Sequence, residues 1–183
     1  AFVAVHGLAL PASGQEGFTW MYDRSLDPDP FQTRLSLAYG IPETDAIQFV
    51  ATCQIGAGGT YALIEIGSDV SGMADGDTVP VTFHGGTFNR TLAGEVFGTQ
   101  AEVGITGASI PVELDDPLWQ AMLAMPMLNY STRLFSEQSI DLAGIHGPLN
   151  SFLADCRDMP GPDAGPAPPP PSASQANPNV ISC

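Results

Sequence analysis

The chain has 183 residues, enough for one domain with additional segments, and 44% of them are hydrophobic, which is sufficient for a core. Its 20 acidic residues far outnumber its 5 basic ones, so the formal net charge is −15. The basic residues are all arginines and are scattered along the sequence. Nucleic acid and anionic membrane surfaces are therefore poor partners, because both need clustered positive charge. A cationic partner, by contrast, would be attracted to this chain.

The first ten residues, AFVAVHGLAL, form an apolar run that is too short to span a bilayer. Ala12 and Gly14 follow at the spacing of small residues that signal peptidase reads. We therefore expect residues 1–14 to be the end of a signal peptide, with an apolar N-terminal strand as the alternative. No other segment approaches membrane-spanning length, so the mature protein is predicted to be periplasmic or secreted, without a membrane span.

Residues 15–30 show no clear periodicity and are interpreted as a lead-in. Beyond them, alternation of apolar and polar residues predicts a series of short, half-buried strands. The pattern is clearest in residues 31–39, where Leu35, Leu37 and Tyr39 share one face. Strands are predicted at residues 31–39, 47–54, 60–67, 79–83, 88–97, 102–105, 109–114, 127–134 and 139–142.

This succession of short strands predicts a mainly β fold, either an antiparallel β-sandwich or a partly open barrel. Two short helices interrupt it. The first is predicted at about residues 116–125, with an aspartate as N-cap and Pro117 in the first turn. The second is predicted at about residues 148–156, after a turn at 144–147. The folded domain is assigned to residues 15–158, and the Pro- and Ala-rich residues 159–183 are expected to be a disordered linker or tail.

Three cysteines constrain the fold further. In an oxidising compartment two of them should pair. Cys53 and Cys156 lie at the edges of well-patterned segments, whereas Cys183 lies beyond the proline-rich stretch, so we predict a Cys53–Cys156 disulfide. Cys183 is then either part of a further domain or a thiol for an intermolecular partner. The cysteines and histidines lack the spacing of a structural zinc site.

An Asp-Gly-Asp turn at residues 75–77 precedes the strand that ends at Phe83, and residues 116–119 read Asp-Pro-Leu-Trp. The pattern continues with Leu128, Asn129, Tyr130, Ile140, Leu142, Gly144, Leu149, Phe152 and Cys156. Over about residues 31–156 this succession resembles the invasion-associated locus B family of small periplasmic proteins from α-proteobacteria. The resemblance implies an exported β-sandwich with an envelope or host-cell role. Many members carry a Trp-x-x-x-Cys motif near the start, whereas Trp20 here has no cysteine nearby.

The sequence holds no GxSxG elbow, P-loop or GxGxxG motif, so no catalytic residue and no cofactor is predicted. His84 and His146 could bind a metal if their predicted turns meet, although two exposed turn histidines explain the pattern more simply. Met122 and Met125 could bind Cu(I) through soft thioethers, although packing in the core explains them more simply. The acidic groups at residues 113–116, 27–29 and 75–77 are interpreted as helix-capping and turn residues, with Ca²⁺ binding or glycosidase chemistry as the alternatives.

Three functions remain open from the sequence. The first is an exported, non-enzymatic interaction or envelope module with a protein or envelope partner. The second is a hydrolase, or an enzyme accessory or inhibitor, whose site forms only in three dimensions. The third is a periplasmic metal-binding protein that uses methionine and histidine.

Overall fold

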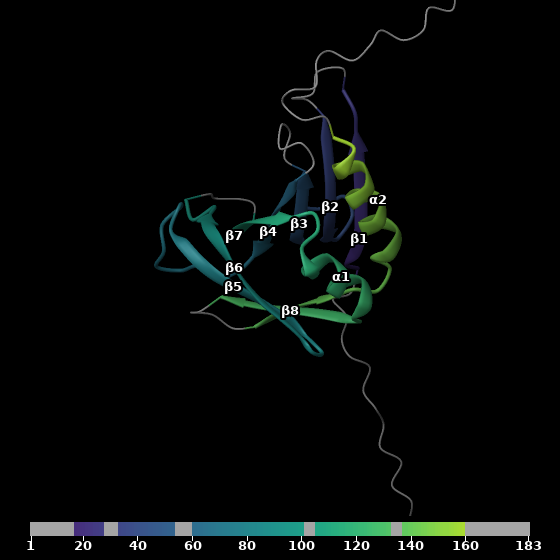
Figure 1. Cartoon of the computed structure of the whole chain (residues 1–183). Helices are drawn as coiled ribbons and strands as arrows, with labels where there is room; N and C mark the ends of the chain where they lie inside the picture. Colours follow the sequence, from purple (N-terminus) through teal and green to yellow (C-terminus); the bar gives the residue numbers. More distant parts are fainter. Residues whose placement is uncertain (1–16, 28–32, 54–59, 101–104, 133–136, 160–183) are drawn as a thin grey trace, which may run out of the picture.

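The computed structural model describes residues 17–27, 33–53, 60–100, 105–132 and 137–159, and the statements below concern these residues. They form nine strands in one antiparallel sheet and two α-helices (Figure 1). The elements are β1 (Thr19–Ser25), β2 (Arg34–Gly40), β3 (Ile47–Cys53), β4 (Tyr61–Gly67), β5 (Thr78–Gly85), β6 (Phe88–Phe97), β7 (Gly107–Glu113), α1 (Pro117–Ala124), β8 (Met127–Thr132), β9 (Gln138–Asp141) and α2 (His146–Arg157).

The strand order in the sheet is β1-β2-β3-β4-β7-β6-β5-β8-β9. Strands β1 to β4 follow one another as in the sequence, and the β5–β6 hairpin lies between β7 and β8. The sheet curls into a half-barrel, with α2 alongside β1 and β2 and α1 in the hollow (Figure 1). The predicted mainly β, antiparallel fold with two helices is therefore confirmed. Of the two architectures left open, the single curled sheet corresponds to the partly open barrel.

Several predicted boundaries need correction. Residues 15–30 are not simply a lead-in, because Thr19–Ser25 form the edge strand β1 and pair with β2 along their whole length. The second helix begins at His146 rather than at residue 148, and it takes in half of the predicted turn. Ile105 lies outside any strand, and the rest of the strand predicted at 102–105 is outside the described residues, as are residues 1–14 and 160–183.

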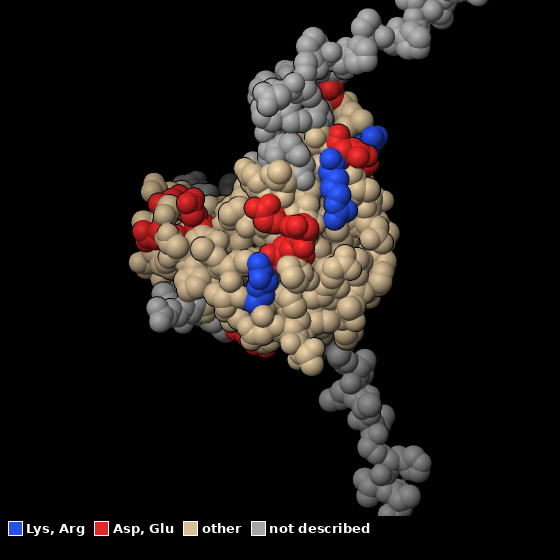
Figure 2. Space-filling view, viewed as in Figure 1, with Lys and Arg blue, Asp and Glu red and all other residues tan. Residues whose placement is uncertain are grey.

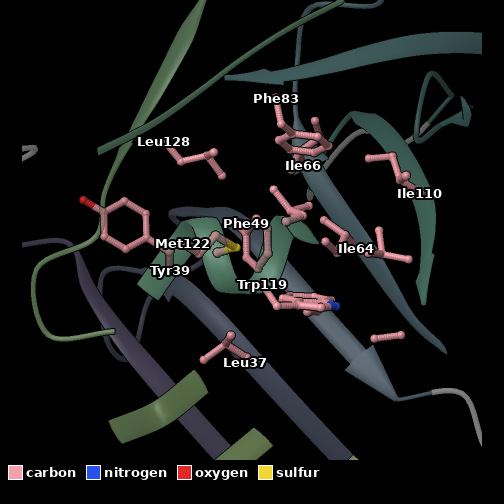
Figure 3. Packing of buried hydrophobic residues seen from close by; sticks show 14 of the residues in the cluster. Leu37, Tyr39, Phe49, Ile64, Ile66, Phe83, Ile110, Trp119, Met122 and Leu128 are labelled. Carbon is pink, nitrogen blue, oxygen red and sulfur yellow. The ribbon is translucent and has the colours of Figure 1, made fainter. Parts of the chain in front are cut away.

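The core lies on the concave face of the sheet, where the predicted alternation places the apolar residues. Leu35, Leu37 and Tyr39 of β2 are buried there, while the residues between them face outward. Helix α1 contributes the buried side chains of Leu118, Trp119 and Met122 (Figure 3), and the Trp119 ring packs against Phe152 of α2 with centroids 6.2 Å apart. Burying each such side chain contributes about 1.5–3 kcal/mol. A helix as short as α1 is not stable by itself in water, so the packing of this apolar face is what stabilises it.

Side chains of β1 and β3 reach across the mouth of the half-barrel to the edge strand β9. The Trp20 indole nitrogen, on edge strand β1, donates a hydrogen bond to the carbonyl of Asp141 in the other edge strand, β9, at 2.8 Å. The Gln48 amide of β3 donates to the carbonyl of Ser139 in β9 at 3.1 Å. An edge strand normally presents unpaired backbone groups that invite aggregation. Here two carbonyls of β9 are occupied by side chains from the opposite end of the sheet.

The predicted disulfide is confirmed, and it joins the end of β3 to the end of α2. Cys53 and Cys156 are 103 residues apart in sequence, with a Cα–Cα distance of 5.7 Å. Asp155, beside Cys156, accepts a hydrogen bond from the Tyr22 hydroxyl at 2.6 Å and pairs with Arg24 at 3.0 Å. Burial, together with this carboxylate, raises the pKa of Tyr22 well above its ordinary value. Strand β1 and helix α2 are thus joined by polar contacts as well as by packing.

Two exposed turns make the stability of the fold depend on pH. Asp69 accepts hydrogen bonds from Ser71, and Asp75 accepts two from Thr99, and these bonds lower the pKa of both carboxyls. A lowered pKa stabilises the folded state at pH values above the unfolded pKa, and that stabilisation is lost as the pH falls through the folded pKa. We expect the melting temperature to fall below about pH 4, and to fall less steeply in Asp75→Asn. Thermal unfolding between pH 3 and 6 measures this, and identical slopes for the two proteins would contradict it.

Candidate interaction groove

Strand β6 separates from its sheet neighbour β7 along most of its length. Within the described strands, β6 pairs with β7 only over Glu95–Phe97, whereas it pairs with β5 over its length from Phe88 to Glu95. Strand β5 stays in the sheet, since Val81–His84 pair with β8. The sheet is therefore open between β6 and β7 over Phe88–Gly94, and α1 lies beside this opening (Figure 1).

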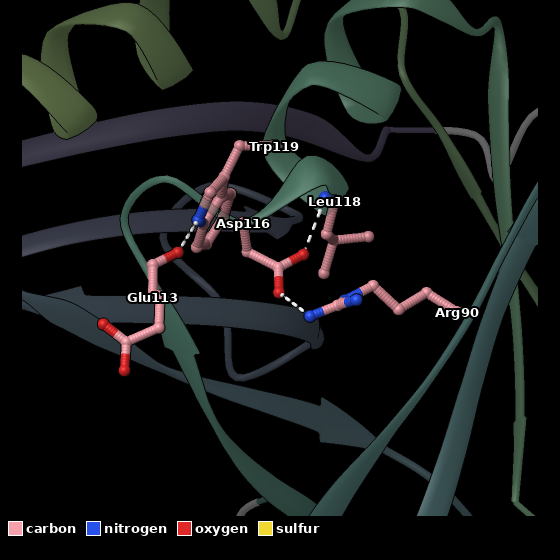
Figure 4. Close-up of polar contacts among 5 residues, drawn as sticks. All are labelled: Arg90, Glu113, Asp116, Leu118 and Trp119. Atoms are coloured by element: carbon pink, nitrogen blue, oxygen red, sulfur yellow. Dashed lines mark hydrogen bonds and ion pairs between the residues drawn. The ribbon is translucent and has the colours of Figure 1, made fainter.

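One buried carboxylate fixes α1 against strand β6. Asp116 is the N-cap of α1: its Oδ1 accepts from the backbone nitrogen of Leu118 at 2.9 Å. Its Oδ2 accepts from the Arg90 guanidinium of β6 at 2.5 Å (Figure 4). At the other side of the same turn, the Trp119 indole donates to the carbonyl of Glu113 at 2.8 Å. Pro117 follows the cap at a position where its missing N–H has no intrahelical partner to lose.

Substitution of Asp116 should separate its two roles. Asp116→Asn keeps an oxygen for the cap but loses the ion pair, whereas Asp116→Ala loses both. The Asp116 side chain is 4% exposed and that of Arg90 is 41% exposed, so solvent screens part of the ion pair. We expect a loss of about 2–3 kcal/mol in unfolding free energy for alanine, and about 1 kcal/mol less for asparagine. Urea unfolding measures the difference, and equal losses would show that the cap contributes nothing.

A groove of about 830 Å³ lies between the tip of the hairpin, α1 and the start of β8. Three other hollows in the described residues have smaller volumes of about 330, 400 and 420 Å³. The side chains that line the groove are mostly apolar and none is charged. They belong to Gly85, Gly86, Thr87, Phe88, Pro117, Gln120, Ala121, Ala124, Met125, Pro126, Met127 and Asn129. Met127 is 40% exposed and is one of two large hydrophobic side chains in the described residues that reach this level.

Charged residues flank the groove without entering it. Asp115 is exposed next to the Arg90–Asp116 pair, at the start of α1. At the β8 end, Met127 pairs with Asp141 of β9 in the sheet register. Next to Gly85, His84 pairs with Glu137 at 2.8 Å. Figure 2 shows that the surface over α1 and β8 is largely uncharged, with acidic groups gathered beside it.

The four side chains predicted as metal candidates have different surroundings. Met122 is fully buried in the core (Figure 3), and Met125 is half-buried and lines the groove. His84 ends β5 against Glu137, whereas His146 is exposed in the first turn of α2 and not in a separate turn. Among the residues that the structure describes, no three His, Cys, Asp or Glu side chains lie together as a metal site would require.

The acidic clusters in the described ranges have structural partners. Asp116 caps α1, Asp77 accepts from the backbone nitrogen of Ala74, and Asp75 bonds to Thr99. These contacts match the predicted capping and turn roles. Neither helix in the described part of the chain has the length and apolar character needed to cross a membrane.

Comparison with known proteins gives no relative for this chain. No family model, no curated protein and no solved structure matches it. The functional interpretation therefore depends on the geometry described above.

Sequence reasoning did not find the groove, although it singled out some of its residues. Of the residues that line the groove, the sequence singles out Met125, as a candidate Cu(I) ligand, and Pro117, as a residue of the first helical turn. The available signal was the run Met125-Pro126-Met127, in which methionines flank a proline at the end of a helix. Two of its three residues are exposed, which apolar periodicity alone does not reveal.

Proposed function

We propose that this protein is an exported, non-enzymatic interaction module of the cell envelope that binds a protein partner through the groove between the β5–β6 hairpin and α1. The observation that carries the proposal is the groove itself. At about 830 Å³ it has the size of a ligand-binding cleft, and it is lined by the partly buried Phe88 and Met125 and by the exposed Met127. Contiguous exposed apolar surface on a folded domain is typical of an interaction site.

Export is supported by the disulfide between Cys53 and Cys156. Structural disulfides form and persist in oxidising compartments, such as the periplasm and the extracellular space. We therefore propose that the protein acts in the periplasm or outside the cell.

We also propose kinship with the invasion-associated locus B family. The residues that carry the resemblance build the fold. Asp116 caps α1, Trp119 and Phe152 are in ring contact at 6.2 Å, and Ile140, Leu142 and Leu149 are buried. A shared set of such residues supports a shared fold, and it leaves the groove free to differ between relatives.

A matched pair of substitutions tests the proposed binding surface. Ala124, in the groove, and Ala154, on α2, are both exposed alanines in helices. We expect the tagged full chain to recover a partner from envelope extract of the cells that make it. Ala154→Arg should recover the same protein, and Ala124→Arg should not, because an arginine fills the groove. If both variants recover the partner equally, the groove is not the binding surface. Recovery of no partner at all would oppose the proposal.

A further inference from the structure

Building on the proposed function, we propose that the groove binds a cationic, apolar segment of the partner: a few apolar side chains flanked by lysine or arginine. Two features of the site lead to this class of partner. They are the composition of the floor and the sign of the charges around it.

The floor is apolar and adaptable. Met125 lies so close to the hairpin that a Cβ atom added to Gly85 would be 2.9 Å from the Met125 sulfur. Hairpin and helix thus form one continuous surface, which Phe88 and Met127 extend. Methionine side chains are flexible and polarizable, and they are frequent in surfaces that accommodate apolar segments of varied shape. The floor therefore favours apolar side chains without demanding one fixed sequence.

The rim is acidic. Asp115 is exposed at the start of α1. Asp141 lies opposite Met127 in the sheet register and accepts a hydrogen bond from the backbone nitrogen of Ala143, and Glu137 pairs with His84. Among the described residues, Arg90 beside the groove is paired with Asp116. The whole chain carries a formal net charge of −15. Because no charged side chain lines the floor, positive groups on a partner would meet these carboxylates at the flanks and would remain partly hydrated. Such complementarity selects partners and speeds their association.

The test uses the full chain and four synthetic peptides of about ten residues, each built from two residue types. The four combinations are lysine with leucine, glutamate with leucine, glutamine with leucine, and lysine with serine. Methyl-labelled methionine reports where each peptide binds. We expect the lysine–leucine peptide to shift the methyl signals of Met125 and Met127 but not those of Met21 and Met73. Its affinity should exceed that of each other peptide by about tenfold or more, and it should weaken as salt is added.

Substitutions separate the two features. Ala124→Arg should abolish the shifts and Ala154→Arg should leave them intact. Asp115→Lys should weaken the lysine–leucine peptide several-fold and leave the glutamine–leucine peptide unchanged. Equal binding of the glutamate–leucine peptide would overturn the charge preference, and equal binding of the lysine–serine peptide would overturn the role of the floor. Self-association of the free chain is a further outcome to measure. If the free chain self-associates and Ala124→Arg abolishes this, the proposed partner class is overturned, since a second copy of the chain would then occupy the groove.

The outcome also separates this inference from the proposed function. In one outcome no peptide binds, although the chain still recovers its natural partner and Ala124→Arg does not. In that case the proposed class of partner is wrong, but the groove is still the binding surface. If the peptide and the partner both fail to bind, both proposals are wrong.

Discussion

Removal of the Cys53–Cys156 disulfide is expected to lower the free energy of unfolding by as much as about 4–5 kcal/mol. The reason is the length of the loop: the two cysteines are 103 residues apart, so the crosslink removes much of the conformational entropy of the unfolded chain. For a domain of this size that is a large part of the total stability. The variant is Cys53→Ala with Cys156→Ala, and urea unfolding at neutral pH measures the loss.

A reductant provides the control for this prediction. It should lower the urea midpoint of the wild-type protein to about that of the double variant, and it should leave the double variant unchanged. Because Cys156 anchors the end of α2, the reduced protein should also lose protection around Leu149 and Phe152, which α2 buries against the sheet. Equal midpoints for the oxidised wild-type protein and the double variant would show that packing alone holds α2 in place.

Gly107→Ala is expected to prevent stable folding, with a loss of more than about 4 kcal/mol. Gly107 begins β7 and pairs with Gly67 of β4 and Phe97 of β6. A Cβ atom there would lie 1.9 Å from the carbonyl oxygen of Ile66 and 2.8 Å from the nitrogen of Ser68. Both are backbone atoms, so the clash can be relieved only by moving one strand away from another, at the cost of ladder hydrogen bonds and core packing.

Gly147→Ala is the matched control. Gly147 lies in the first turn of α2, and nothing within 4 Å would meet an added Cβ. Alanine is a better helix former than glycine, so this substitution should be neutral or stabilise the protein by up to about 1 kcal/mol. Circular dichroism and thermal unfolding distinguish the two variants. A Gly107→Ala protein that melts at the wild-type temperature would refute the close contact between β4 and β7.

The sequence predicted best those features that local pattern determines. Alternation in residues 35–39 gave the buried face of β2, because period two reports directly which side of a strand meets the core. Asp116 and Pro117 predicted the start of α1 because capping is a local requirement. The pairing of Cys53 with Cys156 followed from their positions in patterned segments.

The features that were missed depend on distant parts of the chain. Thr19–Ser25 becomes a strand because β2 pairs with it, because Trp20 bonds to Asp141, and because α2 covers Tyr22. The groove exists because β6 pairs with β7 only over Glu95–Phe97 and because Arg90, in the part of β6 that does not pair with β7, reaches Asp116. No single segment encodes that geometry, since the residues of the groove come from β5, β6, α1 and β8.

Site-specific photo-crosslinking in the cells that make the protein tests the binding surface most directly. A photoreactive residue replaces Gln120, which is exposed in the groove, or Asn150, which is exposed on α2. We predict a crosslinked adduct of one defined mass from position 120 and none from position 150. Adducts at both positions, or at position 150 alone, would contradict the proposal that this protein binds its partner between the β5–β6 hairpin and α1.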